Sequence, residues 1–442
     1  MAIITFFVVN MAKGAIIVIH EELESNVKSY CRSFPTTFGK AKGSILYSSD
    51  DRPYIDFFAG AGALNYGHNH PYIKERLIAY LQEDSIIHGL DMYTEAKQQF
   101  MTDFQEHILS PRGMEYKLQF CGPTGTNAVE AAMKIARKVT QRAGIISFMG
   151  GFHGMSLGSL AATSNRSSRA GAGMPLHNVT FIPYCDGYLK NFDTLGYLEA
   201  LLSDTHSGVE KPAAVIIETV QAEGGIYVAP AQWLEQLAAL CKQHDVLLIV
   251  DDIQVGCGRT GSFFSFERTN VQPDLIVLSK SISGYGLPMS LLLLKPELDV
   301  WSPGEHNGTF RGNQMAFVGA SAALELRSNE NLDQSVLQKG AIIENFLRNE
   351  IKPLIPEVDI RGIGLIWGID FGGCADPMSA ERVAKACFQA GLIIERVGRN
   401  DTVLKIMPPL MIEQDLLLQG CEIIKQTIRL IASGEPLASS IL

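Results

Sequence analysis

The chain has 442 residues, of which 46% are hydrophobic and 19% charged, so it is long enough for two or three domains with a large buried core. It carries 37 Lys and Arg against 47 Asp and Glu, a formal net charge of −10. This balance, without a basic run, argues against a nucleic-acid binder that depends on phosphate neutralisation.

The N-terminus contains two apolar runs, residues 3–9 and 15–19. Neither approaches the ~18 residues that span a bilayer, and no cationic segment precedes the first, so we expect neither a membrane span nor a signal peptide. Two interpretations of residues 1–20 stay open: an extra strand or ordered arm, and a disordered or mis-assigned extension with Met11 closer to the natural start.

Eight cysteines are scattered along the chain, with no CxxC pair and no histidine at zinc-finger spacing. We therefore expect reduced thiols in a cytoplasmic protein and no metal site. The cysteines are Cys31, Cys121, Cys185, Cys241, Cys257, Cys374, Cys387 and Cys421.

From about residue 60 to 313, short apolar runs alternate with segments of helical periodicity. Continuous, largely β-branched runs are typical of parallel strands buried on both faces. Between them lie amphipathic helices, one of which places Leu234, Leu237, Ala238 and Cys241 on a single face. The pattern predicts an α/β domain with a doubly wound, mostly parallel sheet. The predicted strands are residues 145–148, 179–182, 213–217, 246–250 and 275–278.

After Asn313 the pattern changes. We expect a long helical stretch to about Ile351, a Gly-rich strand over 361–371, a helix, extended segments near Leu392 and Val403, and a last helix from Glu413. This order indicates a smaller α+β domain. We predict a large domain over 60–313 and a small domain over 314–442, which the N-terminal segment 1–59 joins.

Ligands of open α/β sheets bind outside the carboxyl ends of the strands. In this sequence those ends carry reactive side chains. One predicted strand is followed by Phe152 and His153, the next by Glu218, another by Asp251-Asp252-Ile253-Gln254, and the last by Ser279-Lys280. The expected edge of the sheet therefore collects an aromatic ring, carboxylates and a lysine.

A lysine and a carboxylate at neighbouring strand ends are what pyridoxal phosphate chemistry requires. The lysine amine forms a Schiff base with the cofactor and later moves protons, and an ionised carboxylate keeps the pyridine nitrogen protonated. We assign these roles to Lys280 and Asp251. From this pair alone, an exposed lysine after a strand and an aspartate that caps a helix remain equally open.

A candidate phosphate site precedes a helix in which Val129, Ala132, Met133 and Ala136 share one face. Gly125 would let the backbone approach an anion, Thr126 would add a hydroxyl, and the helix N-terminus would offer free N–H groups. Many ordinary helices begin in this way, so the motif alone is weak.

Other phosphate motifs are absent from the sequence, which has no GxxxxGK[ST] and no GxGxxG that opens a helix after an early strand. Phe152 and His153 fit a ring-stacking role against a flat cofactor. Packing beneath the Gly-rich loop is their alternative role.

Five segments, in this order, resemble the class III (ω-amino acid) aminotransferases of fold type I, and the resemblance extends from about Glu21 to near the end of the chain. They are TGTNAVEAAMKIAR (124–137), GGFHG (150–154), IVDDIQVGCGRTG (249–261), SKSISGYGLP around Lys280, and NGTFRGN (307–313). The resemblance implies the fold type I architecture and pyridoxal 5′-phosphate as cofactor.

The resemblance also implies roles at matching positions. Lys280 would hold the cofactor, Asp251 would bond its pyridine nitrogen, Gln254 would reach its phenolic oxygen side, and Phe152 would stack on its ring. Gly125 and Thr126 would hold the phosphate.

Two further positions concern the partner and the substrate. Thr309 matches a residue that binds phosphate from the neighbouring subunit, which implies a homodimer with shared active sites. Glu223 matches a glutamate near the substrate pocket.

Within the family, residues 56–71, 88–97, 120–132 and 304–314 look most like the diaminobutyrate–2-oxoglutarate aminotransferases. These make L-2,4-diaminobutyrate from L-aspartate 4-semialdehyde and L-glutamate in a ping-pong cycle, for ectoine, siderophore or related pathways. Two residues depart from the wider family. Lys405 replaces an arginine that clamps a substrate carboxylate, and Ala61 replaces a tyrosine of ornithine-type members. A solvated lysine at a strand edge is the alternative for Lys405.

Three other functions remain open. The nearest is another ω-aminotransferase, acting on ornithine, acetylornithine or 4-aminobutyrate. An intramolecular aminomutase or racemase would use the same fold and lysine. A catalytically silent binding protein is disfavoured, because every cofactor position named above is chemically competent.

Overall fold

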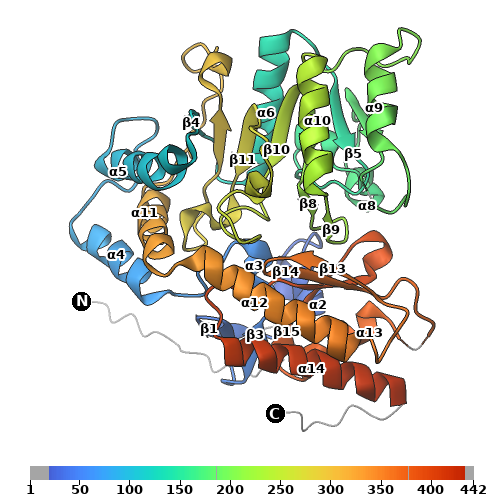
Figure 1. Ribbon diagram of the computed structural model, residues 1–442. Helices are drawn as coiled ribbons and strands as arrows, with labels where there is room; N and C mark the ends of the chain where they lie inside the picture. Colours follow the sequence, from blue (N-terminus) through green and yellow to red (C-terminus); the bar gives the residue numbers. More distant parts are fainter. Residues whose placement is uncertain (1–18, 186, 377, 434–442) are drawn as a thin grey trace.

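The structure, a computed structural model, describes residues 19–185, 187–376 and 378–433. Apart from Ile19, both N-terminal apolar runs lie outside these residues. In Figure 1 a large sheet with helices α6, α9 and α10 forms the upper part, and helices α12, α13 and α14 with smaller sheets form the lower part. Among the described residues, no helix is long and apolar enough to cross a membrane.

The large sheet has seven strands and is mostly parallel, which confirms the predicted α/β fold. All five predicted strands are present, and each parallel pair among them is in register along its length. β12 is antiparallel to both of its neighbours. The order across the sheet is β4 (Lys117–Phe120), β12 (Leu291–Leu294), β11 (Leu275–Leu278), β10 (Leu247–Asp251), β7 (Ala214–Ile217), β5 (Ile145–Phe148) and β6 (Val179–Ile182).

Both faces of this sheet are covered, as its continuous apolar strands require. In β7, Val215 and Ile217 belong to one hydrophobic cluster, while Ala214 and Ile216 belong to another on the opposite face. The first cluster includes apolar residues of α10, and the second those of α6. The helices around the large sheet are α5 (Glu95–Phe104), α6 (Gly125–Thr140), α7 (Leu157–Ala162), α8 (Arg166–Ala170), α9 (Thr194–Ser203) and α10 (Ala231–Gln243). α4 (Pro71–Gln82) instead buries Ile73 and Leu77 in the hydrophobic cluster of the lower part.

The predicted helical stretch after Asn313 is two helices, α11 (Gln314–Asn329) and α12 (Leu332–Phe346), separated at Asn331. The backbone of Asn331 is left-handed, with φ of 46°, so one straight helix cannot continue through it. α11 packs against α4 and α5. Its apolar residues are shared between the cluster on the α10 face of the large sheet and that of the lower part.

The prediction of one Gly-rich strand over 361–371 is wrong. The segment forms a hairpin of β13 (Asp359–Ile363) and β14 (Ile366–Asp370), because Gly364 turns the chain with φ of 55°. A Cβ there would lie 2.4 Å from the carbonyl oxygen of Arg259. The hairpin belongs to an antiparallel sheet ordered β13, β14, β17 (Val403–Ile406), β16 (Glu395–Val397), and helices α13 (Ala380–Gln389) and α14 (Gln414–Ser433) follow the expected pattern.

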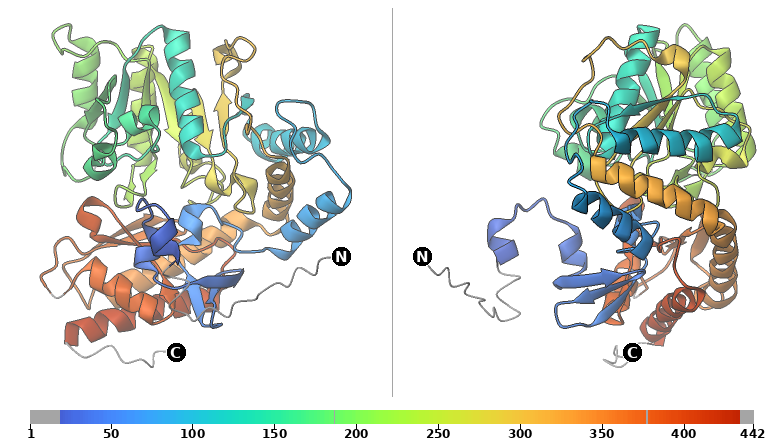
Figure 2. Two further views of the ribbon diagram at one scale, coloured as in Figure 1. Left: turned by 180° about the vertical axis from the view of Figure 1, so that it is seen from behind. Right: turned by 90° about the vertical axis from the view of Figure 1, so that its left-hand side faces the viewer.

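The N-terminal strands join residues from far along the chain. β1 (Phe38–Lys42), β2 (Ile45–Ser48) and β3 (Pro53–Asp56) form a sheet with β15 (Leu392–Ile393), which runs parallel to β3. Figure 2 shows these strands beside the C-terminal helices. The short elements α2 (Tyr30–Ser33), α3 (Ala59–Gly62), β8 (Val220–Gln221) and β9 (Tyr227–Val228) border the site described next.

Candidate active site

A cavity of about 150 Å³ lies at the carboxyl end of the large sheet. The loops after β5, β7, β10 and β11 and the start of α6 form its walls. All the predicted site residues except Lys405 and Thr309 line it, so the structure brings together side chains from five separate segments. The lining residues are Gly125, Thr126, Phe152, His153, Gly154, Glu218, Val220, Glu223, Asp251, Ile253, Gln254, Val255 and Lys280.

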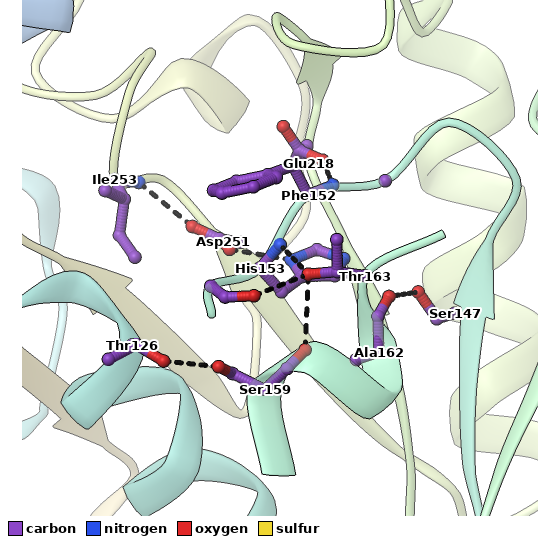
Figure 3. Close-up of polar contacts among 12 residues, drawn as sticks. Thr126, Ser147, Phe152, His153, Ser159, Ala162, Thr163, Glu218, Asp251 and Ile253 are labelled. Atoms are coloured by element: carbon purple, nitrogen blue, oxygen red, sulfur yellow. Dashed lines mark hydrogen bonds and ion pairs between the residues drawn. The ribbon is translucent and has the colours of Figure 1, made fainter. Parts of the chain in front are cut away.

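Asp251, the last residue of β10, is held rigidly and is almost fully buried. Its Oδ2 lies 2.7 Å from His153 Nδ1, and its Oδ1 accepts a hydrogen bond from the backbone N–H of Ile253 at 3.2 Å. His153 is fixed in turn, because its backbone N–H donates to Thr163 Oγ1 (Figure 3). No helix follows Asp251, so the helix-cap alternative is wrong.

The pKa of His153 reflects the same contact. Burial would lower this pKa, but the hydrogen bond to Asp251 and the charges of Asp251 and Glu218 raise it above its usual value. The histidine ring holds the Asp251 carboxylate in one position. A carboxylate fixed in this way can accept a hydrogen bond from a cationic group in the cavity.

Lys280 follows β11 directly and reaches the cavity from a strained backbone. Its φ is 50°, a left-handed conformation that costs about 1–2 kcal/mol for a residue with a Cβ. Burial lowers the pKa of its amine, the charge of Glu223 opposes this effect, and the charge of Lys405 adds to it. The lysine thus lines the cavity and is not an ordinary solvent-exposed side chain.

The start of α6 forms the opposite end of the cavity. Its N-cap, Thr124, donates from both its backbone N–H and its hydroxyl to Asn127 Oδ1, at 3.1 and 2.9 Å. Thr126 Oγ1 lies 2.7 Å from Ser156 Oγ and also contacts Ser159 Oγ (Figure 3). First-turn N–H groups lack partners within a helix, so this end offers several donors to an anion.

Gln254 connects the cavity to a left-handed turn. All four residues of α3, from Ala59 to Gly62, have positive φ. Gln254 Nε2 donates to the Ala61 carbonyl at 3.2 Å and to Glu223 Oε1 at 3.0 Å. Its buried Oε1 has no hydrogen-bond partner among the described residues, and a polar group bound in the cavity could satisfy it.

Glu218 also borders the cavity, although its place after a predicted strand was its only signal in the sequence. Its Oε1 accepts a hydrogen bond from the Phe152 N–H at 2.9 Å, which fixes the loop that carries the aromatic ring (Figure 3). Burial raises the pKa of Glu218 to about 8; the charge of His153 lowers it and the charge of Asp251 raises it. Glu218 is therefore largely a neutral acid at pH 7.

Lys405 adjoins the cavity through Glu223. Its side chain is fully buried, so the solvated-lysine alternative is wrong. Lys405 Nζ lies 2.7 Å from Glu223 Oε1 and 2.8 Å from Glu395 Oε2. Burial alone would raise the pKa of Glu223, but the charges of Lys405 and Lys280 lower it to about 2.

Sequence reasoning missed Glu395. It stands directly opposite Lys405 in the antiparallel pair of β16 and β17. This register brings the two side chains together, but no local spacing in the sequence reveals it. A charged residue within a short β-rich segment was the only available signal.

Thr309 is exposed and is not among the residues that line the cavity of its own chain. The neighbouring Phe310 is also exposed, at 66%, and its ring meets that of His88 edge-on with centroids 5.4 Å apart.

These residues fit pyridoxal 5′-phosphate. The cavity supplies a lysine amine whose pKa is lowered, a buried carboxylate held by a histidine, an aromatic side chain and a helix N-terminus with a hydroxyl beside it. Each matches one part of the cofactor: aldehyde, pyridine nitrogen, ring face and phosphate. The unpartnered Gln254 Oε1 supports the presence of a bound polar group.

The chain is similar to known proteins along nearly its whole length. Residues 28–428 match the sequence profile of the family described as Aminotransferase class-III. The chain is 52% identical over 428 residues to a diaminobutyrate–2-oxoglutarate transaminase from Bordetella parapertussis, covering 96% of this chain and 98% of that protein. It is 53% identical over 417 residues to a protein of the same name from Streptomyces avermitilis, covering 93% and 97%.

Solved structures show the same architecture. An ornithine aminotransferase from Toxoplasma gondii, with partial occupancy of PLP at its active site, matches with a TM-score of 0.83 and 25% identity, covering 96% of each chain. An aminotransferase from Bacillus anthracis matches with a TM-score of 0.83 and 26% identity, covering 94% of this chain and 98% of that one.

Proposed function

The chain belongs to the class III aminotransferases, and from this premise we propose that it forms L-2,4-diaminobutyrate and 2-oxoglutarate from L-aspartate 4-semialdehyde and L-glutamate. The single observation that carries the proposal is the full-length similarity of 52% to transaminases of that name, together with an intact cofactor site. Amino transfer then takes place in two half-reactions at one cavity.

Pyridoxal phosphate, when bound, links covalently to amines and withdraws electrons from the carbon that carries the amino group. The residues of this chain prepare the site for that chemistry. Asp251 would keep the pyridine nitrogen protonated, Phe152 would cover one face of the ring, and Gly125 and Thr126 would hold the phosphate.

Lys280 acts as the base. Its lowered pKa increases the fraction of neutral amine, which can attack the cofactor and, once released, accept the proton from the substrate carbon. It would then deliver a proton to the neighbouring carbon. One amine would thus serve both steps, so no second base is needed.

Glu223 and Lys405 would face the distal end of the substrate. Glu223 lines the cavity and holds Lys405 in place, and the lysine brings a buried positive charge close to where a substrate carboxylate would bind. A lysine binds a carboxylate as a point charge, so this site gives less angular selectivity than a bidentate arginine would.

The test is product identification. The purified holoenzyme is incubated with glutamate and aspartate 4-semialdehyde, and the products are identified by mass spectrometry. We expect 2,4-diaminobutyrate and 2-oxoglutarate in equal amounts. A panel with ornithine, N-acetylornithine and 4-aminobutyrate as donors is the comparison. Higher kcat/KM with one of these than with 2,4-diaminobutyrate, or conversion of a donor in the absence of any carbonyl acceptor, would contradict the proposal.

The proposal includes a cytoplasmic homodimer with shared active sites. Exposed apolar side chains gather on residues 86–93, where Tyr93 is fully exposed, and Phe310 lies against His88 from this segment. A contiguous apolar surface of this kind favours contact with another protein surface. Seven of the cysteines are free thiols, which suits a reducing compartment: Cys31, Cys121, Cys241, Cys257, Cys374, Cys387 and Cys421.

A further inference from the structure

The cluster of Glu223, Lys405 and Glu395 contains more carboxylates than the lysine needs. Two carboxylates lie close to a single ammonium group, at 2.7 and 2.8 Å. Burial and the charge of Glu223 raise the pKa of Glu395 although the charge of Lys405 lowers it, so a second cation beside Glu395 would stabilise its ionised form. One buried carboxylate would be enough to pair the lysine, so the second requires its own explanation.

The two glutamates differ in setting. Glu223 follows β8 on the large-sheet side, keeps 32% of its side chain exposed, and also accepts a hydrogen bond from Gln254. Glu395 lies on β16, opposite Lys405, and only 10% of its side chain is exposed. Its Oε2 is buried and accepts no well-oriented hydrogen bond from the described residues, although Lys405 Nζ lies 2.8 Å away.

Glu395 also acts on the reactive end of the site. Its charge and that of Lys405 both reach the amine of Lys280 and influence its pKa. Tyr30 approaches Glu395 from α2, and burial together with the charge of Glu395 raises the pKa of Tyr30 to about 12. The carboxylate therefore lies between the reacting centre and a half-exposed tyrosine.

The substrates of the proposed reaction differ at the end of the molecule that does not react with the cofactor. When 2,4-diaminobutyrate reacts through its C4 amine, the distal carbon carries an ammonium and a carboxylate. A pair of opposite charges fits a site that offers a lysine and two carboxylates, whereas a lone carboxylate leaves Glu395 without a second cation.

We propose that Glu395 is a specificity residue, which receives the non-reacting ammonium group of the substrate while Lys405 receives the carboxylate beside it. The proposal rests on the proposed function. Glu395 would then contact the α-amino acid end of the substrate, which does not react. This role explains the second buried carboxylate, which is not needed to pair Lys405.

A matched pair of donors tests it. 4-Aminobutyrate is 2,4-diaminobutyrate without the C2 ammonium, so the ratio of kcat/KM for the two donors, with 2-oxoglutarate as acceptor, isolates that one group. In Glu395→Gln we expect the ratio to fall about 10- to 100-fold, the value of a hydrogen bond between charged groups. Almost all of the fall should come from 2,4-diaminobutyrate.

Two further variants separate recognition from structure. In Lys405→Gln we expect kcat/KM to fall for both donors alike, because both carry the carboxylate. Glu381→Gln removes an exposed carboxylate that pairs with Lys385 on α13, and we expect the ratio to stay at its wild-type value. The visible absorbance of the bound cofactor and the unfolding temperature show that each variant is folded.

An unchanged ratio of kcat/KM for the two donors in Glu395→Gln, whether or not both values fall, would overturn the inference. This holds even if the wild-type enzyme prefers 2,4-diaminobutyrate. Failure of the proposed function looks different, because the wild-type enzyme itself would then fail to use 2,4-diaminobutyrate. Should Glu395→Gln not fold, Glu395→Asp keeps the charge but withdraws it by one methylene, and the same fall in the ratio is expected, smaller in size.

Discussion

At the scale of single residues, the site shows how one side-chain type acquires opposite properties. Glu218 and Glu223 are five positions apart and both line the cavity. Burial raises the pKa of Glu218 to about 8, whereas Lys405 and Lys280 overcome the effect of burial at Glu223 and lower its pKa to about 2. One is therefore a neutral hydrogen-bonding acid and the other a permanent negative charge.

The raised pKa of Glu218 makes stability depend on pH. The folded protein binds one proton more than the unfolded chain between the unfolded pKa of 4.5 and the folded value of about 8. The contribution of Glu218 to the free energy of unfolding is therefore greatest below pH 4.5. It decreases as the pH rises to about 8 and is constant at higher pH. At about 1.4 kcal/mol per pKa unit the total is at most about 5 kcal/mol.

Glu218→Gln tests this dependence, because glutamine can accept the same hydrogen bond from Phe152 without ionising. We expect the variant to unfold at a higher temperature than wild type, by a margin that is small near pH 5 and grows up to about pH 8. Calorimetry over this range gives the answer, with Glu381→Gln as a control that should follow wild type. A constant difference between Glu218→Gln and wild type across the range would show that Glu218 is ionised throughout.

At the scale of elements, α6 carries the anion site at its N-terminus. We expect Thr126→Val to weaken cofactor binding about 10-fold, because it removes a hydroxyl from the phosphate end. Thr140→Val changes the last residue of the same helix. The Thr140 hydroxyl donates to the Ala136 carbonyl and accepts from the Arg142 N–H, and the residue does not line the cavity, so cofactor affinity should stay unchanged. Equilibrium titration of apoenzyme with cofactor measures both; equal affinity of Thr126→Val and wild type would remove Thr126 from the site.

Elements with a strong local signal could be predicted from the sequence. The β-branched runs of β5, β6, β7, β10 and β11 and the apolar face of α6 all lie where expected. β12 was not predicted, because four consecutive leucines have no strand periodicity and favour helix as readily. The β13–β14 hairpin was missed because its two-residue turn is marked only by Gly364, which lies among other glycines.

The site residues also divide into those that local sequence patterns predict and those that depend on distant contacts. Lys280, Asp251 and Phe152 could be predicted because parallel strands deliver their following residues to one edge. The environment of Lys405 could not, because the register of β16 on β17 and the approach of Glu223 both depend on contacts between distant segments. Burial decided the properties of Glu218, and its identity alone gave no indication of a raised pKa.

At the scale of the whole molecule, the site lies where the large sheet meets the lower part of the chain. Glu223 belongs to the upper part and Lys405 to the lower, and Arg361 of β13 donates to the Gly225 carbonyl across the same boundary. The division at residue 313 remains a prediction. α11, which begins at Gln314, contributes apolar residues to the clusters of both parts.

The proposed dimer with shared sites predicts complementation between two inactive chains. Lys280→Ala removes the base, and Thr309→Glu would place a negative charge against the phosphate of the neighbouring site. A mixed dimer has one site with both native residues. We therefore expect co-expression with two different affinity tags, and purification through both, to restore up to about half of the wild-type activity per dimer. Inactive mixed dimers, or a monomer by light scattering, would contradict shared sites.

The central claim is that Lys280 carries the cofactor, and covalent mapping tests it most directly. The holoenzyme is reduced with borohydride and digested, and the peptides are sequenced by mass spectrometry. The account predicts one phosphopyridoxyl group, on the peptide that contains Lys280, and none on the Lys280→Ala chain. A phosphopyridoxyl group on another lysine of the wild-type protein, with Lys280 unmodified, would contradict it.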